Sequence, residues 1–185
     1  MKREEQKQEI KDFFEQYYKK YEKFMTLPSV PAAMLAEQQE EEGEWKKWKL
    51  IPATVSDEDL AKLEAQIGVA FPDFFKIFLT TYFHFFDGDV GRHSVDEPFF
   101  AVKNAWNPLL VKAGYLPFTW DRDGYYIRCV DLVNMPDEDK CRICQIDHEV
   151  LFDFDEDSEV KREEIEAAME TVADNFMEYL KGLLG

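Results

Sequence analysis

The sequence predicts an α+β fold, in which helices pack an antiparallel β-sheet and an amphipathic helix is added at the N-terminus. Two observations support this. Apolar residues recur every three or four positions near both ends of the chain, and after Gly114 they form short runs of strand composition separated by turn residues. We expect a helical extension over residues 1–49 and an α+β domain over residues 50–185.

The first expected element is an amphipathic helix over residues 3–25. Its aromatic and aliphatic residues form one continuous stripe opposite Lys and Glu. We expect the stripe to pack on the domain that follows, because exposing so many rings to water is costly; docking of a partner or a second copy is the alternative. Pro28 and Pro31 interrupt this helix, and a second one is expected from Ala32 to about Glu42.

Residues 54–79 predict two short helices joined at Gly68. Ser56 and Asp59 have the spacing of a capping box, and Gly68 suits the left-handed position after a helix end. Pro72 stands where the second helix would begin, since its missing N–H costs nothing there. This punctuation describes architecture and carries no chemistry.

The second helix is expected to continue to Phe86, where Asp87 and Gly88 stop it. Residues 87–98 are polar and predict a surface loop, and residues 99–102 a short strand. The remaining expected segments are strands over 115–118 and 125–130 joined by a turn at 121–124, a strand over 142–146 that residues 150–152 continue or end, and a closing helix over 163–184.

The net charge of −17 is concentrated in the second part of the chain. Residues 1–50 hold 10 Lys/Arg and 11 Asp/Glu, whereas residues 137–170 hold 4 basic and 14 acidic residues. Such a surface repels nucleic acid and anionic membranes and attracts a basic protein partner; a purely solubilising role is the alternative. No apolar run is long enough to cross a bilayer and no signal peptide is recognisable, so we expect a cytoplasmic protein.

Cys129, Cys141, Cys144 and His148 suggest a zinc site, which two features disfavour. A second matching pair of ligands is missing, and residues three apart on a strand point to opposite faces. A thioredoxin-type redox pair is weaker still, because Cys141 does not open a helix. Three cysteines, an odd number, do not form a disulfide framework.

The acidic segment 153–164 resembles a calcium-binding loop. Its loop positions one, three, five, eight and twelve are Asp153, Asp155, Asp157, Val160 and Glu164. Ser158 stands where the turn of such a loop needs Gly, and a strand rather than a helix is expected before it. The alternative is an acidic loop that leads into a helix N-terminus.

Catalysis is not expected. His84, His93 and His148 lie in unrelated sequence contexts, no serine has a nucleophile-elbow motif, and the glycines form no phosphate-binding loop. We therefore expect a non-enzymatic protein without a cofactor or a metal.

The order of several short motifs resembles the SUKH superfamily, of the Smi/Knr cell-wall-regulator type. The similarity covers about residues 50–184. It is carried by Leu63-Glu64, Gly68, Phe71-Pro72 and Phe78-Leu79; by Leu116-Pro117-Phe118, Asp123-Gly124-Tyr125-Tyr126 and Asp131-Leu132; and by Asp147-His148-Glu149 and Asn175-Phe176-Met177-Glu178-Tyr179-Leu180. The Asn-Gly-Gly-like end of the second helix is present only as Phe86-Asp87-Gly88.

The resemblance implies binding. Bacterial members are commonly immunity proteins that neutralise polymorphic toxins, many of them nucleases, and fungal members are interaction scaffolds in cell-wall synthesis. An immunity protein for a basic toxin is our main hypothesis; a regulatory scaffold and a calcium-responsive module are the alternatives. The residues expected to contact the partner are Trp120, Asp121, Asp123, Asp153, Asp155 and Asp157, unless Trp120 is a core residue and the acids serve solvation.

Overall fold

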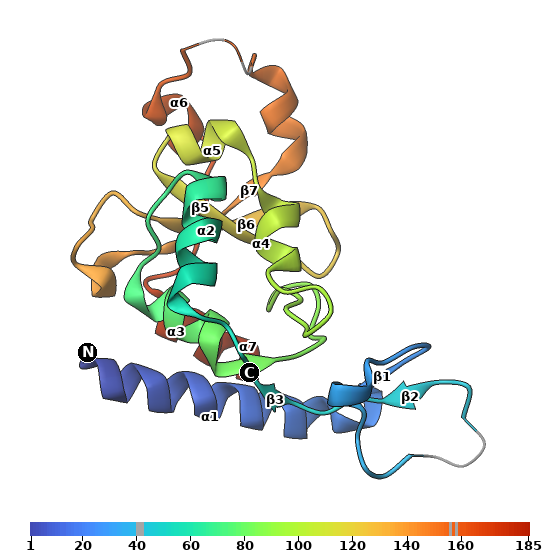
Figure 1. Cartoon of the computed structure of the whole chain (residues 1–185). Helices are drawn as coiled ribbons and strands as arrows, with labels where there is room; N and C mark the ends of the chain where they lie inside the picture. The colour runs from blue at the N-terminus through green and yellow to red at the C-terminus, as the bar shows by residue number, and fades with distance from the viewer. Residues whose placement is uncertain (40–42, 156, 158) are drawn as a thin grey trace.

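The fold is an α+β arrangement with a long N-terminal helix and a four-stranded antiparallel sheet packed against helices (Figure 1). The structure is a computed structural model that describes residues 1–39, 43–155, 157 and 159–185. The arrangement of helices and sheet confirms the predicted α+β fold class. No helix in those ranges is long and apolar enough to cross a membrane.

The elements follow one another in a mixed order. The α-helices are α1 (Arg3–Tyr21), α2 (Asp57–Ile67), α3 (Asp73–Thr81), α4 (Phe100–Ala105), α5 (Pro108–Lys112), α6 (Arg162–Glu166) and α7 (Phe176–Leu184). The strands are β1 (Thr26–Leu27), β2 (Lys46–Lys47), β3 (Ile51–Pro52), β4 (Tyr82–Phe83), β5 (Tyr115–Trp120), β6 (Tyr126–Asp131), β7 (Ile143–Asp147) and β8 (Glu170–Ala173). The 3-10 helices are η1 (Glu22–Phe24), η2 (Ala32–Met34), η3 (Glu138–Lys140) and η4 (His148–Asp153).

The aromatic stripe of α1 packs on the body of the same chain. Ile10, Phe13 and Phe14 are buried, and the Phe14 ring stacks on Phe78 of α3 with 5.1 Å between centroids. The helix lies across the base of the molecule in Figure 1, along α3 and α7. Its apolar side therefore belongs to the main hydrophobic core.

The prediction of a helix from Ala32 to Glu42 is wrong for the part of this range that the structure describes. Ala32–Met34 form only a 3-10 turn, and the amide side chain of Gln39 bonds to the backbone of Ala36 and Lys47. Side-chain bonds of this kind offer the backbone an alternative to the helix. Residues 40–42 of the expected helix lie outside the described residues.

The two helices of residues 54–79 are confirmed with their signals. The Ser56 hydroxyl accepts from the Asp59 N–H at 3.1 Å, and the Asp59 carboxylate accepts from the Ser56 N–H at 3.0 Å. Gly68 ends α2 with a φ of 94°. The extension of the second helix to Phe86 is wrong: α3 ends at Thr81, because Tyr82 and Phe83 pair with β3.

The segment between β4 and β5 also differs from the prediction. Residues 87–98 form a loop, but its His93 and Ser94 are buried. The expected strand over 99–102 is instead the start of α4, because Phe99 takes a left-handed conformation with a φ of 66° and turns the chain into a helix that packs on β5. The sequence pattern there is too short to distinguish a strand from a helix.

The meander is confirmed, and a fourth strand extends it. The sheet order is β5-β6-β7-β8, all antiparallel. Residues 150–152 belong to η4, whose first turn is capped by the Asp147 side chain. The single closing helix over 163–184 is wrong, since it is divided into α6, β8 and α7: residues 170–173 pair with the free edge of β7, and the Asn175 side chain caps a new helix.

Candidate functional site

The tight turn between β5 and β6 lines one side of a hollow of about 640 Å³, here named the acidic hollow. Its walls carry three carboxylates, one guanidinium and two aromatic rings, from Asp87, Asp121, Asp123, Arg122, Phe100 and Trp120. A smaller hollow beside Phe100 adds Asp96 and Glu97. Three of the six expected contact residues therefore share one concave surface.

Asp121 shapes the turn. One of its carboxylate oxygens accepts the N–H groups of Tyr125 at 2.7 Å and Tyr126 at 2.9 Å. Asp123, at the tip, is exposed and has no hydrogen bond or ion pair to any residue that the structure describes. Of these two acids, Asp123 is thus the one whose charge is fully available to a partner.

The opposite wall of the acidic hollow is fixed by a close backbone approach. Gly88 has a φ of 55°, and a Cβ added there would lie 3.0 Å from the Cα of Arg122. The Arg122 N–H donates to Asp89 at 3.2 Å, and the Thr119 hydroxyl donates to the Gly88 carbonyl at 2.6 Å. The two loops are held together before any partner binds.

Trp120 connects the acidic hollow to a group of rings named here the aromatic patch, made of Trp120, Tyr125, His148 and Phe152. The His148 ring lies 5.5 Å from Trp120, 5.1 Å from Tyr125 and 6.2 Å from Phe152. Trp120 is half-buried, whereas Phe152 is 81% exposed. The buried indole N–H of Trp120 has no hydrogen-bond partner among the described residues.

Polar groups hold the aromatic patch in place. The His148 Nδ1 lies 2.7 Å from the Tyr125 carbonyl oxygen, to which a protonated Nδ1 donates. Hydrogen bonding to Asp147 raises the pKa of Tyr125 to about 12, so its hydroxyl stays protonated at neutral pH. These contacts give the patch a defined shape and provide no activated nucleophile.

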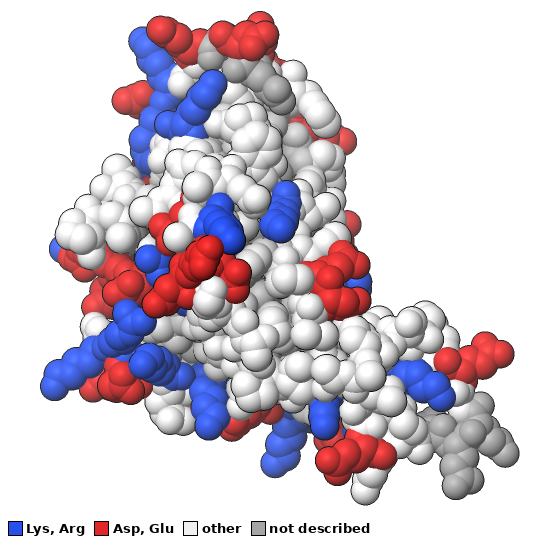
Figure 2. All heavy atoms as spheres, in the orientation of Figure 1, with Lys and Arg blue, Asp and Glu red and all other residues white. Residues whose placement is uncertain are grey.

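The other expected contacts are exposed: Asp153 is the last residue of η4, and Asp155 and Asp157 lie on the segment that follows it. Figure 2 shows acidic side chains gathered at the top of the molecule, the end that holds α6. The Asp155 carboxylate accepts the Asp157 N–H at 3.0 Å. Since the aromatic patch ends at Phe152, it leads directly from Trp120 into this acidic segment.

The calcium pattern is not assembled in the described residues. Glu164, its twelfth position, turns back to accept the Lys161 N–H at 2.9 Å and caps α6. Ser158 lies outside the described residues. Within the described ranges, no group of three or more His, Cys, Asp or Glu side chains is placed to hold a metal ion.

The three cysteines are buried in the core. Cys129 and Cys144 are cross-strand partners in β6 and β7, and none of the three forms a disulfide. Burial raises the pKa of both Cys141 and Cys144 to about 11. They therefore remain thiols at neutral pH in the metal-free protein.

Two histidines that are unrelated in the sequence meet in the core. His84 and His93 form an isolated β-bridge, with 6.2 Å between ring centroids. His93 accepts the Phe99 N–H at 2.9 Å and its other nitrogen lies 2.7 Å from the Leu79 carbonyl oxygen, so the ring is a neutral, fully bonded core residue. No local sequence pattern predicts this pair, because it is the fold of the loop over residues 87–98 that brings His93 next to His84.

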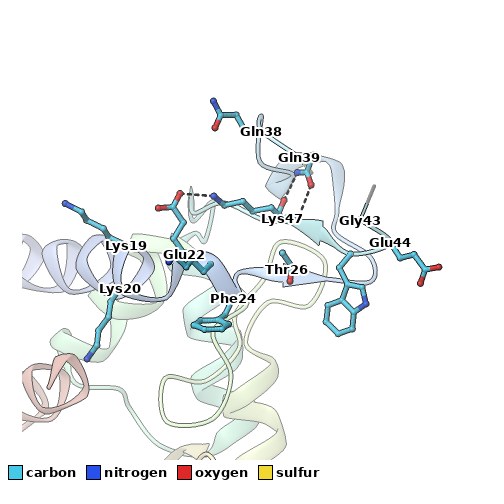
Figure 3. Close-up of a pocket in the computed structure, with 12 residues that line it drawn as sticks. Lys19, Lys20, Glu22, Phe24, Thr26, Gln38, Gln39, Gly43, Glu44 and Lys47 are labelled. Carbon is cyan, nitrogen blue, oxygen red and sulfur yellow. Dashed lines mark hydrogen bonds and ion pairs between the residues drawn. The ribbon is translucent and has the colours of Figure 1, made fainter. Parts of the chain in front are cut away.

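A larger hollow of about 840 Å³ lies at the far end of α1, around η1 and β2. Figure 3 shows that its charged side chains do not converge: Lys19 and Lys20 point apart, and Lys47 is held between Glu22 and Gln39. The Lys20 ammonium donates instead to the Leu184 carbonyl at 2.6 Å. We therefore place the candidate site at the acidic hollow and the aromatic patch.

Comparisons of the chain with protein-family models, with curated proteins and with solved structures found no match.

Proposed function

We propose that the chain is a non-enzymatic protein-binding module that neutralises a basic protein partner, in the manner of a cytoplasmic immunity protein. One observation carries the proposal: Trp120 and the exposed Phe152 lie between two groups of carboxylates, one in the acidic hollow and one that begins with Asp153 at the end of η4. Aromatic anchors surrounded by charged groups are typical of the residues that dominate binding energy at protein interfaces.

The charge of the chain favours a cationic partner. Residues 51–185 hold 28 acidic and 12 basic residues, a net charge of −16 out of −17. A nuclease needs a positively charged surface to hold the phosphate backbone of its nucleic-acid substrate. Such a surface is complementary to the acidic hollow. Nucleic acid and anionic membranes are repelled by the same charge, so we propose neither as a partner. The proposal needs no cofactor.

The resemblance to the SUKH superfamily supports a toxin as the partner. The capped helix pair, the Leu-Pro strand and the Asp-Gly turn occur in α2–α3, β5 and the β5–β6 connection, in the order typical of that family. We propose a SUKH-like fold on this basis. The fungal members supply the alternative, a scaffold that regulates cell-wall synthesis through several partners.

Co-expression with the toxin encoded by a neighbouring gene tests the proposal. The native chain is expected to restore growth and to co-purify with the toxin. The double variant Asp123→Lys/Asp153→Lys should lose protection, because it reverses two exposed charges of the site. Asp57→Lys, at the exposed start of α2 and outside the acidic hollow, is the matched control and should still protect.

Two results would count against the proposal. If every neighbouring toxin killed cells that contain the native chain, the immunity function would be wrong. If the double variant protected as well as Asp57→Lys, binding would take place elsewhere on the surface. Weak binding of several unrelated proteins without any protection would favour the regulatory scaffold.

A further inference from the structure

Another concave surface lies in the angle between the end of α1 and the body of the molecule. It is a hollow of about 350 Å³, here named the aromatic hollow. Its walls are mainly rings, from Tyr17, Tyr21, Phe24, Trp48, Phe85 and Phe86. This volume lies at the small end of the range of ligand-sized pockets, which suits one large side chain better than a whole cofactor.

The walls of the aromatic hollow are locked by ring contacts. The Phe86 ring lies 4.8 Å from Tyr17 and 5.0 Å from Trp48, both in edge-on geometry. The Tyr18 hydroxyl donates to the Trp48 carbonyl at 2.6 Å and fixes the chain behind the indole. A preformed hollow binds without the entropic cost of ordering its walls.

The rim of the aromatic hollow leaves apolar surface in water. Phe24 is 75% exposed, and Tyr17, Tyr21 and Leu27 are half-buried. Single exposed apolar residues are ordinary, but here they surround one concavity. An occupant would cover all four at once.

The aromatic hollow adjoins the acidic hollow. Asp87 and Arg122 line both of them. The close approach of Gly88 to Arg122 makes this shared wall a fixed ridge. A cation bound on one side of the ridge therefore lies next to an apolar group bound on the other.

We propose that the aromatic hollow receives one large apolar side chain of the same basic partner, next to the Lys or Arg residues that enter the acidic hollow. The inference rests on the proposed function for the identity of the partner. This choice of occupant follows from the complementarity between a basic partner and Asp87, Asp121 and Asp123, and from the wall that the two hollows share. The partner's contact segment would combine basic residues with one aromatic or leucine-sized residue.

The test uses two short peptides, N-acetyl-Lys-Phe-Lys-amide and N-acetyl-Lys-Gly-Lys-amide, titrated into the full chain. The chain has four Trp, so its NMR spectrum contains four indole N–H signals. Trp48 reports on the aromatic hollow and Trp120 on the acidic hollow, while Trp45 and Trp106 line neither. We expect both peptides to shift Trp120, only the Phe peptide to shift Trp48, and that peptide to bind about tenfold more tightly.

Phe24→Ala should remove most of the advantage of the Phe peptide without changing the affinity of the Gly peptide. Trp45→Ala is the control, because Trp45 is a 55% exposed ring of the same region that lies outside the aromatic hollow. Unchanged Trp106 and Trp120 indole signals in the free variants would show that both are folded.

The two proposals fail separately. Equal affinity of the two peptides, or undiminished binding of the Phe peptide by Phe24→Ala, would overturn the proposal that the aromatic hollow receives an apolar side chain. This holds even if the Trp120 indole signal shifted. A shift of the Trp48 signal without any shift of the Trp120 signal would contradict cation binding in the acidic hollow and still support binding of the apolar side chain in the aromatic hollow.

Discussion

Single residues of this chain gain their roles from burial. His84 and His93 are both enclosed, and burial lowers the pKa of His93 to about 4 and that of His84 well below 6.5. Both rings are therefore neutral in the folded state at pH values at which an unfolded histidine is already protonated. Folding then releases protons, which links stability to pH.

We predict that these histidines reduce stability as the pH falls. A folded pKa below the unfolded one gives stability that is complete above about pH 7 and is lost on acidification, by about 1 kcal/mol per histidine between pH 7 and pH 5.5. Urea unfolding at both pH values measures this. His84→Phe should show a smaller loss than the native chain, and this comparison cancels the contribution of the carboxylates. An equal pH dependence in both proteins would contradict the prediction.

Asp131 is 1% exposed and joins the sheet to α6. Its carboxylate accepts from Arg142 at 3.0 Å and from Arg162 at 2.8 Å. We predict that Asp131→Asn lowers the free energy of unfolding by about 2–4 kcal/mol, because it removes the buried negative charge that two guanidinium groups share and leaves them only their bonds to Glu166, Thr171 and the Ala113 carbonyl. Asp137→Asn, which affects the exposed pair with Lys140, should cost much less. Similar values for both variants in chemical denaturation would show that the buried network contributes little.

At the scale of elements, the acidic hollow depends on how two loops approach each other. Gly88→Ala would place a Cβ 3.0 Å from the Arg122 backbone, at a φ of 55°. Gly124→Ala, in the same hollow, has a φ of 69° but meets no atom within 4 Å. We predict that Gly88→Ala costs about 1–3 kcal/mol more than Gly124→Ala and shifts the Trp120 indole signal. Thermal unfolding and NMR of both variants would show this, and equal costs would contradict it.

Elements with local signals were predictable from the sequence, and those that depend on distant pairing were not. The capping box of Ser56, the turn at Gly68 and the turn that joins β5 to β6 each involve residues a few positions apart. By contrast, β4 and β8 exist because β3 and β7 offer them edges, and no window of sequence contains both partners.

The residues of the candidate site likewise divide into those that could be predicted from a local pattern and those that could not. Trp120, Asp121 and Asp123 could be found because they belong to one tight turn. The contribution of Asp87 and the whole aromatic hollow could not, since α1, Trp48 and Phe85 meet only in the folded chain.

For the molecule as a whole, α1 contributes to the main core. Burial of a large apolar side chain contributes about 1.5–3 kcal/mol, and α1 buries Ile10, Phe13 and Phe14. We predict that deletion of residues 1–25 lowers stability by more than about 5 kcal/mol, which is comparable to the total stability of a typical domain. Loss of near-ultraviolet circular dichroism in the truncated protein would show this. A cooperative melt of residues 26–185 near that of the native chain would show instead that they fold independently.

The uneven distribution of charge has a consequence for how the molecule turns in an external field. Residues 147–166, which include η4 and α6, hold 10 acidic and 2 basic residues, whereas residues 1–50, which include η1 and β2, hold 11 acidic and 10 basic residues. Such a separation gives the protein a permanent electric dipole along its long dimension. Near a positively charged body it would feel a torque and rotate its acidic end forward before any contact forms. This orientation should vanish once the ionic strength makes the Debye length, about 8 Å at 0.15 M, much shorter than the molecule.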